Sequence, residues 1–187
     1  MKHFTKHLNS ILNTTRELND FQLDDTILKL FHDHKRVIFC TMGKSAFACR
    51  KIVYTARSFS LEWHDLDVCH AFHGDAGLIK SDDLLVFISK SGNTRETVEV
   101  AKYFRNYQTI SITSNKDCKL KKYCDNNIVI PVSEEGSPFG YAPMASTSSY
   151  MIILHAILSS VIRYKDIKLN TFAKNHPAGT IGEKLVE

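Results

Sequence analysis

The sequence predicts an α/β protein built on a doubly wound parallel sheet. Two observations predict this fold class. Short runs rich in β-branched and other apolar residues recur along the chain, and stretches with helical spacing separate several of them. Because a parallel strand needs a crossover long enough to carry a helix back over the sheet, this alternation indicates βαβ units. In such sheets ligands bind at the carboxyl ends of the strands, so we expect functional motifs there.

Two helices are expected in residues 1–35, before the first strand. A set of apolar residues close to a 3.6-residue period predicts an N-terminal helix with one buried face: Phe4, Leu8, Ile11, Leu12 and Leu18. A second helix is expected over residues 24–34, and no linker follows it. At 187 residues the chain is long enough for one well-buried core and short for two. We therefore expect a single domain over residues 1–187, with its core and C-terminal segment in residues 36–187.

The sheet is expected to contain strands at residues 36–41, 60–66, 84–89, 109–114 and 127–132. Helices are expected between several of them, notably over residues 45–58 and 94–106. A further capped helix over residues 146–163 is apolar around most of its circumference. A helix of this kind is either central to the fold or covered by another subunit.

Net charge, the N-terminal segment and the cysteines indicate which partners the protein binds and in which compartment it works. The net charge of +4 comes from 24 basic and 20 acidic residues without a long basic run, so we expect neither nucleic acid nor a membrane as partner. A local basic pocket for a small anion remains open. The N-terminus has no continuous apolar segment of signal-peptide or membrane-span type. Five cysteines without a CxxC pair predict reduced thiols, mostly small apolar fillers, and a cytoplasmic protein.

The segment FISKSGNTRET, residues 87–97, groups short hydroxyl side chains around one glycine where an apolar strand stops and a helix begins. Ser89, Ser91 and Thr94 would offer hydroxyl donors, the glycine turn would free backbone N–H groups, and the helix would add the positive end of its dipole. Together these groups would bind a phosphate. The alternative is a plain N-cap, since Ser, Asn and Thr are favoured there in any protein, but three hydroxyls exceed what capping needs.

The first strand ends in TMGKSAF, which is similar to the tail of a nucleotide P-loop. That motif needs a glycine five positions before Gly43, and Ile38 stands there, so this is not a nucleotide-binding sequence. Lys44 and Ser45 would still supply a cation and a hydroxyl to an anionic ligand. The alternative for Lys44 is an ordinary solvated lysine.

Histidine and acidic residues are concentrated in WHDLDVCHAFHGDAG, residues 63–77. The spacing of His64, His70 and His73 matches no common structural zinc site, so we expect no metal. A turn of His73, Gly74 and Asp75 that lines a polar pocket fits the pattern better. The alternative is a surface loop that collects such residues without a function.

Two later segments carry further candidates. The loop at residues 134–149 is long for a compact domain, and its Glu134 and Glu135 could transfer protons if burial near the phosphate site raised the pKa of a carboxyl group. The alternative is that both are solvated. Near the end, NHPAGTIGEKL at residues 175–185 places His176 before Pro177 and two glycines, a rigid and closely approaching turn.

Taken in order, these segments resemble the sugar isomerase (SIS) domain, and specifically the arabinose-5-phosphate isomerase family. The resemblance rests on GKSAFACRK, FHGDAGLI, FISKSGNTRE, the AP-x-x-ST run at residues 142–147, and NHPAGTIGEKL. It implies a flavodoxin-like three-layer α/β/α sandwich. It also implies a tetramer that interconverts D-ribulose 5-phosphate and D-arabinose 5-phosphate, the first step toward the acidic sugar Kdo of lipopolysaccharide and capsules. Longer members carry regulatory CBS domains after the isomerase domain; this sequence ends at Glu187, so we expect no regulation through them.

By the same resemblance the catalytic residues are Lys44, Glu96, Glu135 and His176, and the phosphate is held by Ser89, Ser91 and Thr94. An aldose–ketose isomerase moves one proton between C1 and C2 through an enediol, which needs no cofactor. We assign Glu135 as the first choice for the C–H base and Glu96 as the second. Lys44 would stabilise the enediolate or help to hold the phosphate, and His176 would transfer protons at oxygen.

Two further expectations concern assembly and alternatives. His176 lies in a short segment after the apolar helix and can leave its own domain, so we expect active sites shared between subunits of a homotetramer. One alternative function is an SIS isomerase for a hexulose or heptose phosphate. A second is a non-catalytic sugar-phosphate sensor, which would keep the serine turn without needing the carboxylates.

Overall fold

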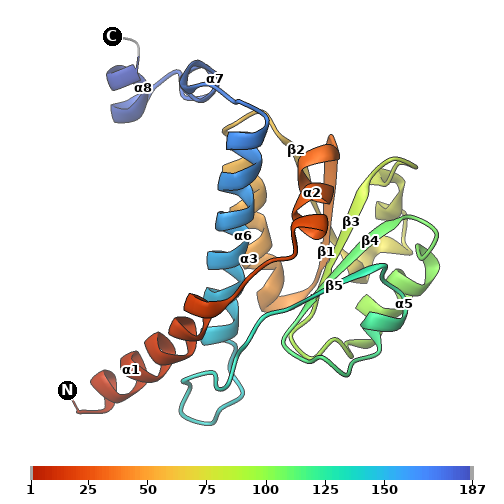
Figure 1. Ribbon diagram of the computed structural model, residues 1–187, viewed down its shortest axis with the longest axis vertical. Coiled ribbons are helices and arrows are strands. Elements are labelled where there is room, and N and C mark those ends of the chain that lie inside the picture. The colour runs from red at the N-terminus through yellow and green to blue at the C-terminus, as the bar shows by residue number, and fades with distance from the viewer. Residues whose placement is uncertain (1, 186–187) are drawn as a thin grey trace.

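The computed structural model describes residues 2–185 and shows a five-stranded parallel sheet in the order β2-β1-β3-β4-β5 (Figure 1). The strands are β1 (Arg36–Thr41), β2 (Glu62–Asp67), β3 (Leu84–Ile88), β4 (Gln108–Thr113) and β5 (Asn126–Val129). This order confirms the predicted doubly wound sheet, because the chain winds outward in both directions from β1 and β3. The switch point between β1 and β3 is where such folds bind ligands.

The helices lie close to the predicted ranges, but the buried face predicted for the first helix is wrong, because Phe4, Leu8 and Leu12 are exposed. They are α1 (Lys2–Arg16), α2 (Asp25–Asp33), α3 (Gly43–Arg57), α4 (Val68–Ala71), α5 (Arg95–Tyr103), α6 (Ala145–Tyr164), α7 (Leu169–Lys174) and α8 (Gly179–Leu185). Short 3-10 turns complete the chain: η1 (Glu17–Asp20), η2 (Asp75–Leu78) and η3 (Leu120–Lys122). Asp24 caps α2, since its carboxylate accepts a hydrogen bond from Thr26 N.

Two elements are shorter than the sequence predicts. β5 ends at Val129 rather than at residue 132. Ile130 N still donates to Thr113 O at 2.8 Å, but Pro131 has no N–H with which to continue the ladder. α5 ends at Tyr103 rather than at residue 106.

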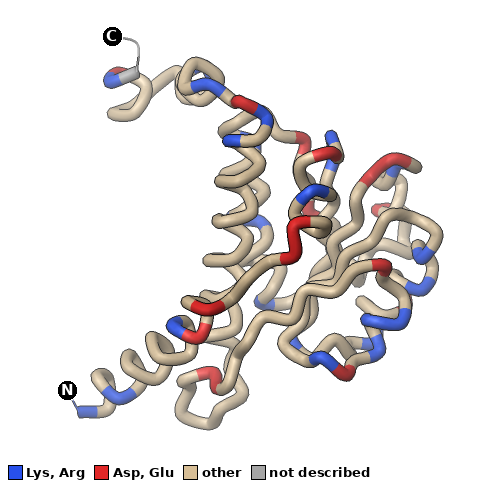
Figure 2. Tube along the Cα trace, in the orientation of Figure 1, with Lys and Arg blue, Asp and Glu red and all other residues tan. Residues whose placement is uncertain are grey.

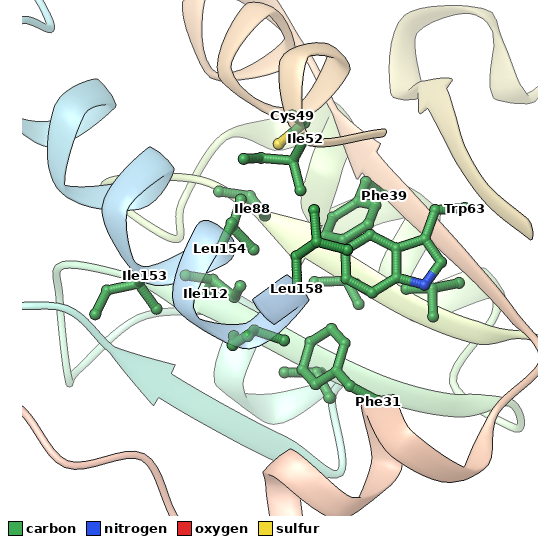
Figure 3. Packing of buried hydrophobic residues seen from close by; sticks show 14 of the residues in the cluster. Phe31, Phe39, Cys49, Ile52, Trp63, Ile88, Ile112, Ile153, Leu154 and Leu158 are labelled. Atoms are coloured by element: carbon green, nitrogen blue, oxygen red, sulfur yellow. The ribbon is translucent and has the colours of Figure 1, made fainter. Parts of the chain in front are cut away.

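The core lies on both faces of the sheet, which gives three layers. Along β1, Val37 and Phe39 face α2, α3 and α6, whereas Ile38 and Cys40 face α4 and α5. On the first face Trp63 from β2 lies 5.3 Å from Phe39 between ring centroids, and Ile52 and Leu158 pack around them (Figure 3). Strands buried on both faces are expected to be apolar at every position, as β3 is with five buried residues.

Helix α6 is central to the fold, which is one of the two predicted alternatives. It packs against α1, α2 and α3, and Figure 2 shows it almost without charged residues. By length and composition alone α6 could cross a membrane, but about half of it is buried inside the protein, as in the core helix of an α/β domain. At its two ends α1 and α8 extend away from the sheet (Figure 1).

The cysteines behave as predicted from their spacing. Cys40, Cys49, Cys118 and Cys124 are buried free thiols, and Cys69 is an exposed one. Burial raises the pKa of the Cys49 and Cys124 thiols to about 12, so both stay protonated. They act as small apolar fillers of the two cores.

Candidate active site

The turn after β3 brings together the hydroxyl groups that are predicted to bind a phosphate, and we call residues 89–94 the cradle. Ser89 is 5% exposed, and its hydroxyl lies 2.8 Å from the Thr94 hydroxyl and accepts a hydrogen bond from Gly92 N at 3.2 Å. Gly92 has a φ of +62°, and a Cβ there would lie 2.4 Å from Cys118 Sγ, so only glycine fits. Thr94 stands at the N-cap of α5, yet its side chain makes no capping bond among the described residues. Thr94 therefore does not cap α5 through its side chain, and the first N–H groups of the helix are left without this partner.

The turn after β1 supplies the opposite wall. β1 and β3 pair directly, with Cys40 beside Phe87, so the two turns that follow them lie side by side. Gly43, with a φ of +60°, opens α3, and Lys44 and Ser45 follow in its first turn. Met42 at the N-cap offers α3 no side-chain bond in the part of the chain that the structure describes. Two uncapped helix N-termini thus meet at the switch point of the sheet.

A cavity of about 250 Å³ lies between these turns. Five of the predicted site residues line it: Lys44, Ser45, Ser89, Ser91 and Thr94. Thr97 and Lys90, for which the sequence analysis gave no role, line it too. The Thr97 hydroxyl is buried and has no hydrogen-bond partner within residues 2–185. Lys90 and Thr97 both lie in FISKSGNTRET, where the pattern that indicates phosphate binding is limited to Ser89, Ser91 and Thr94.

Glu135 lies directly behind Lys90. Its carboxyl group is only 1% exposed, with Lys90 Nζ 2.5 Å from Oε1. The other oxygen, Oε2, accepts hydrogen bonds from Met144 N and Ser146 N, both at 3.0 Å, at the start of α6. Burial raises the pKa of this carboxyl group, but the bonds from Lys90 and Ser146 outweigh burial and hold the pKa below its ordinary value.

This corrects one expectation. Glu135 is buried near the cradle, as the proton-transfer hypothesis required, but its pKa is lowered instead of raised. The physical reason is that an ammonium group and two backbone N–H groups all stabilise the ionised form. Glu134, the other acidic candidate, is exposed, and its Oε1 accepts a hydrogen bond from the Ser10 hydroxyl.

Two predicted residues are exposed and do not line the cavity. Glu96 lies in the first turn of α5, between Thr94 and Thr97, which do line it. His73 follows α4, and its backbone N–H donates to His70 O at 2.8 Å. The roles predicted for Glu96 and His73 stay predictions.

His176 lies at the opposite end of the sheet. Its Nδ1 is 2.8 Å from Phe172 O, and its ring stacks on Phe172 with centroids 4.0 Å apart. The neighbouring Asn175 amide donates to Ser58 O and Ser60 Oγ, at the end of α3. The 20 residues of α6 separate this anchor from Glu135, which is about 30 Å at 1.5 Å per residue. His176 therefore cannot reach the cavity of its own chain in this arrangement.

The other cavity and the histidine clusters described below do not combine hydroxyl groups, a lysine and helix N-termini as this cavity does. A larger cavity, about 490 Å³, lies at the amino end of the sheet beside residues 165–168, where acidic and basic side chains mix. Within the described residues no group of three His, Cys, Asp or Glu side chains could hold a metal ion. His64 instead lies 3.2 Å from Arg36, and His70 lies 4.0 Å from Asp75.

Comparison with known proteins gives consistent results. The SIS domain family matches residues 30–177. The chain is 32% identical over 176 residues to arabinose 5-phosphate isomerase KpsF of Escherichia coli, covering 93% of this chain and 56% of that protein. It is 31% identical over 182 residues to a Haemophilus influenzae protein named as a probable arabinose 5-phosphate isomerase, covering 95% of this chain and 53% of that one. The chain thus spans about half the length of these relatives.

One solved structure of similar length resembles the whole chain. It is c3406 of Escherichia coli CFT073 in complex with arabinose 5-phosphate, with a TM-score of 0.86 and 26% sequence identity. The match covers 93% of this chain and 95% of that one. The flavodoxin-like three-layer architecture is therefore shared along almost the entire length.

Proposed function

The chain belongs to the SIS domain family, and we propose that it is an aldose–ketose isomerase that interconverts D-ribulose 5-phosphate and D-arabinose 5-phosphate. One observation carries the proposal. At the switch point between β1 and β3, a hydroxyl-rich turn, two open helix N-termini and Lys44 surround a cavity, and Lys90 in its lining pairs with the buried Glu135. Relatives named for this reaction and a similar structure solved with arabinose 5-phosphate support the choice of sugar phosphate.

The phosphate would bind in the cradle of Ser89, Ser91 and Thr94. Hydroxyl groups and the first N–H groups of α5 would donate to its oxygens, and the positive ends of both helix dipoles would favour its charge. Lys44, across the cavity, would then stand beside the carbon end of the sugar and stabilise the enediolate oxygen that develops there. The substrate would thus be held by its phosphate, which takes no part in the reaction, while C1 and C2 remain free to react.

Glu135 would move the proton between C1 and C2. It is ionised, because its pKa is held low, so it can accept a proton at neutral pH. Lys90 lines the cavity and also contacts Glu135 Oε1, so an incoming phosphate would attract the ammonium group away from the carboxylate. Such a shift would free Oε1 and raise its basicity at the moment when substrate is bound.

His176 would come from a second copy of the chain. Its anchor lies at the far end of α6 from the cavity, while α8 and α1 extend outward at opposite ends of that helix (Figure 1). An exposed apolar stripe on α1, formed by Phe4, Leu8 and Leu12, is available for packing against another subunit. We propose a homotetramer in which the C-terminal segment of one subunit completes the cavity of its neighbour.

The pathway and the compartment are part of the proposal. D-Arabinose 5-phosphate made by this reaction would enter Kdo synthesis, for lipopolysaccharide or capsule, in the cytoplasm. A panel of five-, six- and seven-carbon ketose phosphates tests the substrate directly. Turnover of ribulose 5-phosphate above the others supports the proposal, and turnover of a hexulose or heptose phosphate in its place overturns the choice of sugar.

Isotope exchange tests the chemistry. In heavy water the reaction should place deuterium on the carbon-bound position of product or recovered substrate, because an enediol exchanges its proton. Glu135→Gln should reduce this exchange by about 10²- to 10⁴-fold, since the amide is nearly isosteric but takes no proton. Glu99→Gln, an exposed change on α5, is the matched control. If Glu96→Gln abolishes exchange and Glu135→Gln does not, the two roles are reversed. A wild-type protein that binds sugar phosphates without any exchange would be a sensor.

A further inference from the structure

The N-terminal helix holds the loop that carries Glu135. His7 Nδ1 donates to Gly136 O at 2.9 Å, the Ser10 hydroxyl donates to Glu134 Oε1, and the Thr14 hydroxyl donates to Glu134 O at 3.2 Å. Just after α1, the Glu17 carboxylate accepts hydrogen bonds from the backbone N–H and the hydroxyl of Ser133. We call these four residues (His7, Ser10, Thr14 and Glu17) the α1 clamp. The first three recur at helical spacing and share one face of α1, and Glu17 follows in η1.

Close packing between the loop and α1 accompanies these hydrogen bonds. Gly136 has a φ of +69°, and a Cβ at this position would lie 2.6 Å from Ile11 Cγ1, so the loop lies directly against α1. Thr14 is only 1% exposed, although threonine is mostly an exposed residue in proteins, so its side chain is packed against the rest of the protein. Figure 1 shows the loop between β5 and α6 beside α1.

Glu135 is the one residue of the segment 133–136 that the α1 clamp does not touch. Its carboxylate is held from the other side, by Lys90 and by the N–H groups of Met144 and Ser146. Its backbone oxygen accepts a hydrogen bond from Ala145 N at 3.2 Å. The loop is therefore fixed between two helices, with α1 on its flanking residues and α6 on Glu135 itself.

We infer that the α1 clamp positions Glu135 for proton transfer, so that His7, Ser10, Thr14 and Glu17 are positioning residues of the reaction. The inference rests on the proposed role of Glu135 as base. Proton transfer requires the carboxylate within hydrogen-bonding distance of the reacting carbon, and a displacement of about 1 Å can cost about 100-fold in rate. α1 lies far from the phosphate cradle in sequence and makes no contribution to the lining of its cavity.

The decisive variant combines Ser10→Ala, Thr14→Val and Glu17→Met, which removes the side-chain hydrogen bonds of these three residues to the loop with little change in volume. We expect kcat to fall about tenfold or more, because the base is displaced, while KM changes less than about twofold, because the cradle is intact. Thr15→Val is the matched control, since the Thr15 hydroxyl donates to Leu12 O within α1. Thr14→Ser, which keeps the hydroxyl, should retain most of the activity that Thr14→Val loses.

Two readouts separate positioning from a general loss of stability. If the loop shifts, Glu135 loses the N–H groups of Met144 and Ser146, and the acidic limb of the kcat/KM profile should move to higher pH. Amide hydrogen exchange at Met144 and Ser146 should also become faster in the triple variant and stay unchanged in Thr15→Val.

Unchanged kcat and unchanged exchange at these two amides in the folded triple variant would overturn the inference. Equal losses in Thr15→Val and Thr14→Val would overturn it as well, because the effect would then belong to α1 as a whole. Since amide exchange needs no substrate, faster exchange in a protein without isomerase activity would reject the proposed function and retain the clamp as a structural device.

Discussion

The two ends of the sheet differ in what they contribute to the proposed reaction. The carboxyl end holds the cradle, Lys44 and Lys90 around one cavity, with the buried Glu135 paired to Lys90. The amino end holds His176, which stacks on Phe172 and is anchored through Asn175 to the end of α3. If the proposal is right, one chain carries two incomplete halves of a site, because the 20 residues of α6 keep Glu135 and His176 apart.

The strongest test of this comparison is subunit complementation. Lys44→Ala and His176→Ala should each lose about 10²- to 10⁴-fold in kcat, as expected for groups that contact the reacting atoms. When the two inactive proteins exchange subunits, a hybrid pair contains one intact cavity, with Lys44 from one chain and His176 from the other. Isomerase activity should then partly return. Hybrids that are confirmed by mass and stay inactive would place His176 in the site of its own chain.

The next largest effect should come from the cradle. Ser89→Ala and Ser91→Ala should each weaken binding of ribulose 5-phosphate by about 1 to 3 kcal/mol, or about 5- to 150-fold in Kd, because each removes a donor to a charged group. Titration calorimetry measures this directly. Ser159→Ala, at an exposed position of α6, is the control, and binding that is unchanged in both cradle variants would remove the phosphate from this end of the sheet.

A smaller effect concerns the pH dependence of Glu135. Lys90→Met leaves Glu135 buried but removes the ammonium group that lowers its pKa, so the acidic limb of the kcat/KM profile should move to higher pH. The stabilisation that Lys90 gives is present above the unfolded-state pKa of a glutamate and is lost as pH falls through the folded-state pKa. The variant should therefore be less stable than wild type at neutral pH, with a difference that shrinks in acid. Lys116→Met, exposed in a neighbouring loop, should move neither the limb nor the stability.

The smallest effect is expected at the amino end. Asn175→Ala removes two hydrogen bonds, to Ser58 O at 3.0 Å and to Ser60 Oγ at 2.8 Å. At this exposed site the loss should be about 1 kcal/mol or less in unfolding free energy. If the anchor orients His176 toward the neighbouring cavity, kcat should fall more than this small change in stability explains, whereas Asn170→Ala on exposed α7 should change neither. A fall in stability without a fall in kcat would make the anchor purely structural.

The sequence by itself determined the sheet and its turns. Apolar runs in 36–41 and 84–89 became adjacent parallel strands, because strands buried on both faces need apolar residues throughout. The glycine turn between Ser89 and Thr94 was predictable as well. A positive φ favours glycine, and the hydroxyl side chains are neighbours of Gly92 in the sequence. The five predicted residues that line the cavity all come from the two turns after these strands.

Only the tertiary structure decided the environment of Glu135 and the place of His176. Sequence patterns gave no sign that Lys90 would pair with the distant Glu135, or that α1 would hold the loop that carries this glutamate. The lowered pKa follows from that pairing, because charge and hydrogen bonds act through space and not along the chain. His176 is separated from the cavity by the length of α6. The sequence predicts how long this helix is, but only the structure shows that the helix runs from one end of the sheet to the other.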